Sequence, residues 1–382
     1  MIKKLLADTS VNIGGWTTNK KYIVIESDDW GAIRTPDKKA YDSMLESGIP
    51  VDKSLFCRMD TLVDANELET VFSILDKYKD SLGNSAVITA DAVVANPDFE
   101  KIKADNYNSY HYETVDKTLD QYFPGNSPFK LWKEGIDKKL FIPQFHGREH
   151  VNVPHWLKVL KDGDEFFLKA FDNKCWGIST DIYPKYKKSI QATFDCTEKD
   201  DLNYLEDALK DGLNVFENLF GYRSETFIPN NYIFPEELLP TLHESGVTAM
   251  QGMKYQKLPH IPGQSRRMVR RYNGQNVGEK PGLLQMVRNT HFEPSLFPYQ
   301  QREKALKSCL GQIKISFLLK KPAIISCHRI NFSGRLEPEN RDVNLKLMDK
   351  LLSEIVRRWP DVIFTDSASL AKIIKADLQK KK

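Results

Sequence analysis

The chain has 382 residues, with 55 basic and 52 acidic side chains and a net charge of +3. This near balance, without a basic stripe interleaved with aromatic residues, disfavours a nucleic-acid partner. The five cysteines are odd in number and no two are spaced as Cys-x-x-Cys, which disfavours a disulfide framework and a thiolate zinc site.

The N-terminal segment has no apolar run of signal-peptide length, and no stretch approaches the length of a membrane span. We therefore expect a cytoplasmic protein with no membrane span. The sequence predicts no particular oligomeric state.

The first half of the chain opens with a β-branched strand that ends at two adjacent acids, Asp28 and Asp29. A clear amphipathic helix is expected at 66–80, with Asn66 as its N-cap. In chain order, the expected elements are strand 21–27, helices 36–47 and 66–80, strands 85–91 and 140–146, and helix 154–161.

The second half continues the alternation of helix and strand, with a loop or hairpin expected at 255–282. In chain order, the expected elements are helix 199–219, strand 226–231, helix 235–245, strands 247–250 and 283–287, helix 300–319, strand 322–328, helix 339–358 and strand 361–365. Such alternation predicts a parallel β/α architecture.

The number of strands favours a barrel over a doubly wound sheet. We predict an α/β fold, a distorted (β/α) barrel of about seven parallel strands. It should form one domain over residues 1–382, because no linker rich in Gly, Ser or Pro divides the chain. The core is expected at about 21–370, with insertions at about 100–137 and 162–196.

Titratable side chains follow the predicted strands. Asp28 and Asp29 follow the first strand, His146 and His150 the third, and His328 the seventh. Because the carboxyl ends of parallel barrel strands face one mouth, we expect these side chains to converge.

Arg223, just before the fourth predicted strand, is a further candidate for this site. A cation there would compensate the paired carboxylates, which otherwise repel each other. The alternative for Arg223 is an ordinary surface ion pair.

The spacing of His146 and His150 suits a metal ion. If the chain turns helically after the strand, both imidazoles face one side and can bind one ion. One carboxylate would complete a His₂Asp set with an open position, which is typical of catalytic zinc. A single histidine is more often a core or surface residue, but the joint pattern favours a site.

The same residues also fit His-x-x-Glu-His, the signature of a class of metallopeptidases, with Glu149 as general base. That class carries the motif inside a helix. Pro143 before the motif and Gly147 within it favour a strand end, so this interpretation ranks second.

The ordered motifs resemble those of the polysaccharide deacetylases, the NodB-homology family of metal-dependent carbohydrate esterases, over about residues 21–370. The family's aspartate pair corresponds to Asp28-Asp29, its His-x-x-x-His motif to His146–His150, its arginine motif to Arg223 with the later Pro229, and its last histidine to His328. The family's tyrosine near the third motif and its Asp/Trp motif are not found.

This resemblance implies removal of acetyl groups from an N-acetylated sugar or polysaccharide. It implies a divalent ion, zinc before other metals, bound by Asp29 and the two histidines of the second motif. It further implies that Asp28 is the general base, that Arg223 orients it, and that His328 protonates the leaving amine.

Two other kinds of function stay open, because a fold does not fix a reaction. One is another hydrolase on the same scaffold, such as a glycosidase or a metallopeptidase. The other is a catalytically inactive relative that binds carbohydrate. Acetate release and metal content separate these possibilities.

Overall fold

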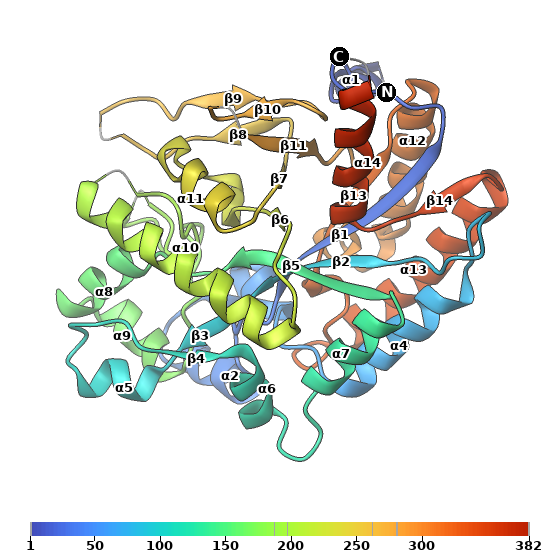
Figure 1. The fold of residues 1–382 in the computed structure, drawn as a ribbon. Helices are drawn as coiled ribbons and strands as arrows, with labels where there is room; N and C mark the ends of the chain where they lie inside the picture. Colours follow the sequence, from blue (N-terminus) through green and yellow to red (C-terminus); the bar gives the residue numbers. More distant parts are fainter. Residues whose placement is uncertain (1, 187, 197, 262, 280–281, 381–382) are drawn as a thin grey trace.

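The computed structural model describes residues 2–186, 188–196, 198–261, 263–279 and 282–380. At its centre lies a ten-stranded sheet in the order β10-β11-β7-β6-β5-β2-β1-β13-β12, with β14 paired to β1 (Figure 1). Its strands are β1 (Lys21–Trp30), β2 (Ile88–Val93), β5 (Phe141–Gly147), β6 (Thr226–Phe227), β7 (Ala249–Gly252), β10 (Asn276–Val277), β11 (Leu283–Val287), β12 (Thr290–His291), β13 (Ala323–His328) and β14 (Val362–Phe364).

The segment from β11 to β12 joins the two edges of this sheet. Strand β11 runs parallel to β7, whereas β12 runs parallel to β13. Between them the Arg288 amide donates to Gly252 O at 2.9 Å, and the next amide, of Asn289, donates to Ile324 O at 3.2 Å. We count β11 and β12 as one bent strand. Together with β1, β2, β5, β6, β7 and β13 it makes seven parallel strands, which form a closed ring. The predicted distorted (β/α) barrel is confirmed, and β10 is its antiparallel addition.

Helices cover the outside of the barrel on two sides. On one side, α4 (Ala65–Lys77), α7 (Phe129–Asp137), α12 (Glu303–Leu318) and α13 (Pro338–Arg358) bury apolar residues against β1, β2, β5 and β13. On the other side, α10 (Lys199–Phe220) and α11 (Leu239–Glu244) pack on β5, β6 and β7 (Figure 1). Burial of these helical stripes is the main favourable contribution to the fold.

The N-cap of helix α4 lies two residues before the predicted one. Asp64, not Asn66, caps the helix, and it forms a capping box with Glu67. Asp64 accepts from the Glu67 amide at 2.9 Å while the Glu67 carboxylate accepts from the Asp64 amide at 3.0 Å. A reciprocal pair satisfies two backbone donors where a single cap satisfies one.

The floor of the barrel interior is apolar and is closed by α14 (Ser367–Lys380). Val24, Met286 and Ile324 face inward and pack against Leu370 and Ile374 of this helix. Both termini lie together at this end of the molecule, next to α14 (Figure 1). The polar residues of the strands are therefore left at the opposite, carboxyl end of the barrel.

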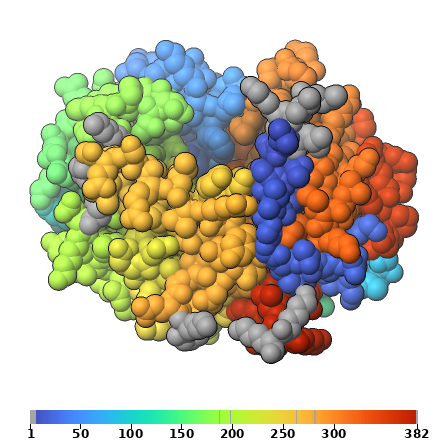
Figure 2. Space-filling view, turned by 90° about the horizontal axis from the view of Figure 1, so that it is seen from above, coloured from blue at the N-terminus to red at the C-terminus, as the bar shows by residue number. Residues whose placement is uncertain are grey.

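The N-terminal residues form a helix that the sequence did not predict, α1 (Ile2–Ser10). The segment lies between the yellow-orange strands after β7 and the orange α12 region (Figure 2). Hydrogen bonds hold it there, from Gln312 Nε2 to Asp8 at 3.0 Å and from Arg270 to Ile13 O at 3.2 Å.

The remaining elements surround the carboxyl end of the barrel. They are α2 (Lys38–Glu46), α3 (Leu55–Met59), β3 (Ala95–Pro97), α5 (Phe99–Ala104), β4 (Tyr112–Thr114), α6 (Val115–Tyr122), α8 (Val153–Lys161), α9 (Glu165–Asp172), β8 (Tyr255–Lys257) and β9 (Met268–Arg270). The segment predicted as an insertion at 100–137 thus holds mainly helices, whereas the one at 162–196 holds α9 and a long irregular stretch. Both contribute to a second apolar cluster around Trp156 and Trp176. No helix in the described part of the chain is long and apolar enough to cross a lipid bilayer.

The closure of the barrel generates a prediction about Asn289. Its buried side chain donates to Pro322 O at 2.8 Å and accepts from the Ile324 amide at 2.9 Å. Asn289→Ala leaves both backbone groups unpaired, so we expect a loss of about 3 kcal/mol in the free energy of unfolding. Urea unfolding measures this loss.

The matched control is Asn276→Ala on exposed strand β10, which should change stability by less than about 0.5 kcal/mol. Equal effects of the two substitutions would show that Asn289 does not hold the closure.

Candidate active site

Strand β1 places two neighbouring carboxylates at one site by breaking its own geometry. On a regular strand, consecutive side chains point to opposite faces. Here Asp29 has φ +72°, in the left-handed region, and the pairing of β1 with β2 shifts register between Ser27 and Trp30. Aspartate tolerates this conformation better than most residues do. The bulge turns both Asp28 and Asp29 toward the same cavity.

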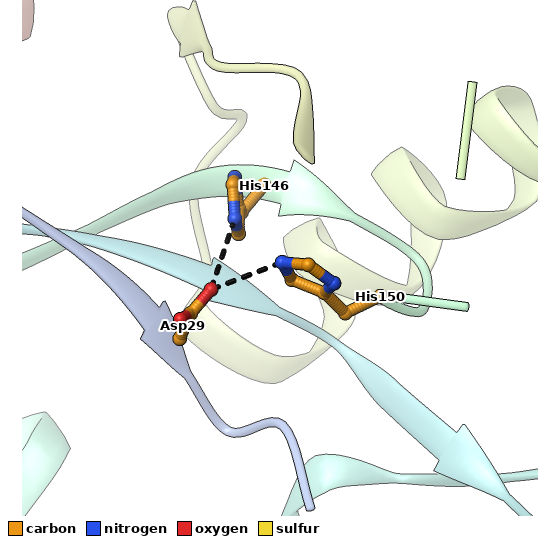
Figure 3. A group of neighbouring side chains, drawn as sticks. All are labelled: Asp29, His146 and His150. Atoms are coloured by element: carbon orange, nitrogen blue, oxygen red, sulfur yellow. Dashed lines mark ion pairs between the residues drawn. The ribbon is translucent and has the colours of Figure 1, made fainter. Parts of the chain in front are cut away.

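Asp29 meets two histidines at the end of β5 (Figure 3). Its Oδ1 lies 3.0 Å from His150 Nε2 and 3.5 Å from His146 Nε2. His146 is the penultimate residue of β5, and His150 lies in the loop that follows. The chain does not turn helically between them, yet the imidazole centroids are only 5.2 Å apart. The three predicted ligands are thus brought together.

These side chains fit a divalent metal ion. The two nitrogen–oxygen separations are close to the edge of a tetrahedron whose ligands lie about 2.0–2.1 Å from its centre. Two imidazoles and one carboxylate are a donor set that suits zinc. His146 Nδ1 lies 2.8 Å from Ile228 O, so a proton on Nδ1 leaves Nε2 free to bind. Burial lowers the pKa of His150, which favours the neutral form that a metal requires.

Arg34 contacts the other oxygen of Asp29. Its Nη2 lies 3.3 Å from Asp29 Oδ2, and its Nε donates to Asp60 at 3.0 Å. Burial would raise the pKa of Asp29, but His150, hydrogen bonds from both imidazoles and Arg34 hold it well below the usual value. The Asp29 carboxylate therefore stays ionised, with Oδ1 directed to the histidines.

Asp28 is paired with an arginine that the sequence analysis did not select. Arg288, between β11 and β12, donates to Asp28 Oδ1 at 2.5 Å and to Oδ2 at 2.6 Å. Burial would raise the pKa of Asp28, but the charge and hydrogen bonds of Arg288 lower it to about 2. Asp28 is therefore a buried carboxylate that stays charged at neutral pH.

The predicted partner of Asp28, Arg223, is elsewhere. Its side chain is 56% exposed and pairs with Glu217 at 2.9 Å, at the end of α10. The placement of Arg223 beside Asp28 was therefore wrong, and the surface ion pair was the correct alternative. The physical reason is its position: Arg223 precedes its strand, whereas Arg288 follows β11 directly.

Arg288 also binds two further acids inside the barrel. Its Nε donates to Glu26 at 2.6 Å and its Nη2 to Asp91 at 2.9 Å. Burial and the neighbouring charge of Asp28 raise the pKa of Asp91 well above its usual value. This shift favours the protonated form of Asp91 next to the ionised Asp28.

His328 reaches the same cavity from the end of β13. Its Nε2 lies 3.6 Å from Asp28, and its Nδ1 lies 2.6 Å from Glu293. Burial would lower the pKa of His328, but Glu293 raises it to about 10. Glu293 lies two residues beyond β12, a strand too short to give a sequence pattern, so the sequence analysis missed it.

The two aspartates, the three histidines and Arg34 line one cavity of about 330 Å³. The predicted residues on its wall are Asp28, Asp29, His146, His150 and His328. The others are Arg34, Phe56, Gln191, Pro229, Asn231, Tyr232, Lys257 and Leu296. Gln191 comes from the predicted insertion at 162–196.

Glu149 does not join this cavity. Its carboxylate is buried and accepts from Arg148 Nε at 2.7 Å, and Arg148 also donates to Asp211 and Tyr204. The His-x-x-Glu-His stretch is a strand end and loop, not a helix. The geometry therefore does not support a metallopeptidase site with Glu149 as base.

No family model and no curated protein matches the chain. Three solved structures are similar to it over nearly its whole length. A candidate polysaccharide deacetylase from Mycobacterium smegmatis has 10% identity and a TM-score of 0.42, covering 95% of this chain and 93% of its own. A polysaccharide deacetylase, described as probable, from Pseudomonas aeruginosa PAO1 has 8% identity and a TM-score of 0.44, with 93% and 91% covered.

The third similar structure is the allantoinase PuuE, with 10% identity, a TM-score of 0.45 and 94% and 91% covered. The barrel itself is established by the pairing of this chain's own strands. Similarity this distant assigns no activity.

The two arginines give a direct test of the site's electrostatics. Arg288→Gln removes the cation that pairs with both Glu26 and Asp28, so we expect a loss of about 3–5 kcal/mol in the free energy of unfolding. Arg223→Gln breaks only an exposed pair and should cost less than about 1 kcal/mol. Urea unfolding of both variants is the measurement; a comparable cost for both would contradict this account.

A second test concerns Glu293 and His328. In metal-free protein, Glu293→Gln should lower the pKa of His328 from about 10 toward 6.5, measured by NMR titration of the imidazole. Because the folded-state pKa is raised, the pair stabilises the fold fully below about pH 6.5 and loses this contribution as the pH rises through about 10.

Glu237→Gln, at an exposed glutamate, is the control and should leave the pKa of His328 at about 10. If Glu293→Gln also leaves it there, another group supports the charge of His328.

Proposed function

We propose that the chain is a divalent-metal-dependent amide hydrolase that removes acetyl groups from an N-acetylated sugar or glycan. One observation carries the proposal. A metal-type triad, an ionised carboxylate with its own arginine, and a cationic histidine with its own glutamate line a single cavity. Each group has the protonation state that its role in amide hydrolysis requires.

The triad Asp29, His146 and His150 would hold the ion, with zinc favoured by the nitrogen and oxygen donors. A divalent ion in such a site supplies Lewis acidity and a water whose pKa is lowered to about 7. The chain's own contribution is to keep Asp29 charged and both imidazoles directed at the same point.

Asp28 serves as the general base. A base must be unprotonated at the working pH and within reach of the attacking water. Its pKa of about 2 meets the first condition, and its place beside Asp29 in the cavity wall meets the second. Arg288 fixes the carboxylate in one orientation by binding both of its oxygens.

His328 serves as the general acid. An amide's leaving nitrogen needs a proton, and His328 carries one because Glu293 holds its pKa at about 10. It stands on β13, across the cavity from His146 on β5 and His150 in the loop after it, with Asp28 and Asp29 of β1 between them. Base and acid can therefore act on opposite sides of one bound amide.

The decisive experiment compares Asp28→Asn with Asp29→Asn. We expect Asp28→Asn to keep its metal but to release acetate from N-acetylated oligosaccharides about 10²–10⁴-fold more slowly. Asp29→Asn should instead lose metal, because an amide is a weaker ligand than a carboxylate. Elemental analysis, acetate release and circular dichroism on the same preparations give all three readouts.

The opposite pattern, with metal lost from Asp28→Asn and kept in Asp29→Asn, would exchange the two roles. If wild-type protein binds metal but releases no acetate, the deacetylase proposal fails in favour of another hydrolase. If wild-type protein binds no metal, the inactive carbohydrate-binding alternative gains support.

A further inference from the structure

The stretch from Met253 to Gly278 has an unusual charge composition. It contains six basic residues and no acidic one, although the chain as a whole is nearly balanced. It forms the β8–β9 hairpin, a two-stranded sheet separate from the barrel. A local excess of charge in one segment indicates a surface that meets opposite charge.

Some of these basic residues form ion pairs with acidic residues of the protein itself. Arg266 pairs with buried Asp195 at 2.7 Å, and Arg271 pairs with Glu236 at 2.6 Å. Arg267 lines a separate cavity that also holds Glu198 and Glu237, so it does not add to a free basic surface. Lys254, Lys257 and Arg270 are different: among the described residues, no carboxylate lies within ion-pair distance of them.

These cations, of which Arg270 donates to Ile13 O and Lys254 to the Ser10 hydroxyl, lie on or beside one face of the hairpin. Tyr255 is paired with Arg270, and Lys257 with Met268, in the antiparallel register. Opposed residues, and residues two apart on a strand, share a face. This set, Tyr255, Lys257, Met268 and Arg270, is the hairpin face, and all four side chains are exposed.

The hairpin face carries an aromatic ring among its charges. Tyr255 is 46% exposed, and the Lys254 ammonium lies 5.1 Å from its ring centroid. An exposed aromatic ring offers an apolar surface on which a sugar ring can pack, while the flanking cations suit carboxylate groups. The combination fits an acidic sugar chain better than a neutral one.

The hairpin face continues into the candidate active site. Lys257 lies on it and also lines the 330 Å³ cavity. Its carbonyl accepts from the Phe234 amide at 3.2 Å, which ties β8 to the loop containing Asn231 and Tyr232. Lys257 therefore belongs to both the cavity wall and the hairpin face.

The charged side chains on the cavity wall also favour an anionic ligand. Its carboxylates are the two site aspartates, one paired with Arg288 and the other directed to the histidines. The remaining charged groups on the wall are Arg34, Lys257 and the cationic His328. No acidic side chain on the wall would repel an anionic ligand beyond those two.

We propose that the substrate is an acidic N-acetylated glycan, whose acetamido sugar occupies the cavity while neighbouring carboxylate-bearing sugars lie on the hairpin face. This inference rests on the proposed function, since it names the substrate class of the same site. Lys257 and Arg270 are the specificity-determining cations, and Tyr255 supports a sugar ring between them.

The test compares two N-acetylated tetrasaccharides of equal length. One alternates N-acetylglucosamine with glucuronic acid, and the other is N-acetylglucosamine throughout. Calorimetric titration at about 50 mM NaCl should show tighter binding of the acidic chain, and the difference should shrink at about 500 mM, where exposed charges are screened. Equal affinities at low salt would overturn the inference.

The variant Lys257→Gln/Arg270→Gln should weaken binding of the acidic chain roughly fivefold more than binding of the neutral chain, as for two exposed ion pairs. Lys346→Gln on the exposed side of α13 removes a lysine elsewhere and should change neither. An equal loss for both glycans would overturn the assignment, because it would show a general rather than a charge-specific effect.

Acetate release from the same mixtures separates the two proposals. Efficient deacetylation of the neutral chain with no preference for the acidic one would overturn the inference while the proposed function stands. Charge-dependent binding without acetate release from either chain would support the inference and contradict the deacetylase. Tighter binding of a single-stranded DNA of equal charge would overturn the inference in favour of a nucleic-acid surface.

Discussion

A guanidinium inside a barrel needs anionic partners, and Arg288 has three, Glu26, Asp28 and Asp91, at 2.5–2.9 Å. Three ionised acids around one cation would leave excess negative charge in a water-poor interior, which is costly. The opposite pKa directions of Asp28 and Asp91 relieve this excess: the pKa of Asp28 is lowered and that of Asp91 is raised. Negative charge therefore remains on Asp28, which lines the cavity.

The position of Arg288 in the chain links this charge balance to the fold. The barrel closes where the chain changes neighbours, from β7 to β13, and Arg288 and Asn289 occupy that change. Asn289 supplies hydrogen bonds that hold the edge of β13, while Arg288 extends into the interior. Arg288 and Asn289 are adjacent in the chain. A shift of this segment would therefore alter both the charge balance around Arg288 and the closure of the barrel by Asn289.

The sequence indicated the candidate site because the carboxyl ends of parallel strands lie together at one end of a barrel. Asp28, His146 and His328 each follow an apolar run, and such a run is visible without any structure. Consistent use of that rule would have rejected Arg223, which precedes its strand, and selected Arg288, which follows the predicted strand 283–287. Glu293 could not be found this way, because β12 is two residues long and has no periodicity.

The conformation of Asp29 was also beyond the sequence alone. A bend near Gly31 could be expected, since glycine permits it, and Gly31 does have φ +82°, but nothing in the sequence indicated that Asp29 is left-handed as well. A bulge depends on pairing with β2 and β13, which are distant in sequence. The local sequence therefore indicated which residues lie near the candidate site. The pairing of strands distant in sequence determined which way their side chains point.

The proposed division of work between Asp28 and Asp29 rests on their arginines more than on their own chemistry. Arg288 binds both oxygens of Asp28 at 2.5 and 2.6 Å, which leaves neither oxygen free of a cation. Arg34 contacts only Oδ2 of Asp29, at 3.3 Å, and Oδ1 stays directed at the histidines. Asp28 and Asp29 therefore differ in which carboxylate oxygens are left without an arginine contact: neither oxygen of Asp28, and Oδ1 of Asp29. A carboxylate fixed through both oxygens is suited to accept a proton without moving, and one with a free oxygen is suited to bind an ion.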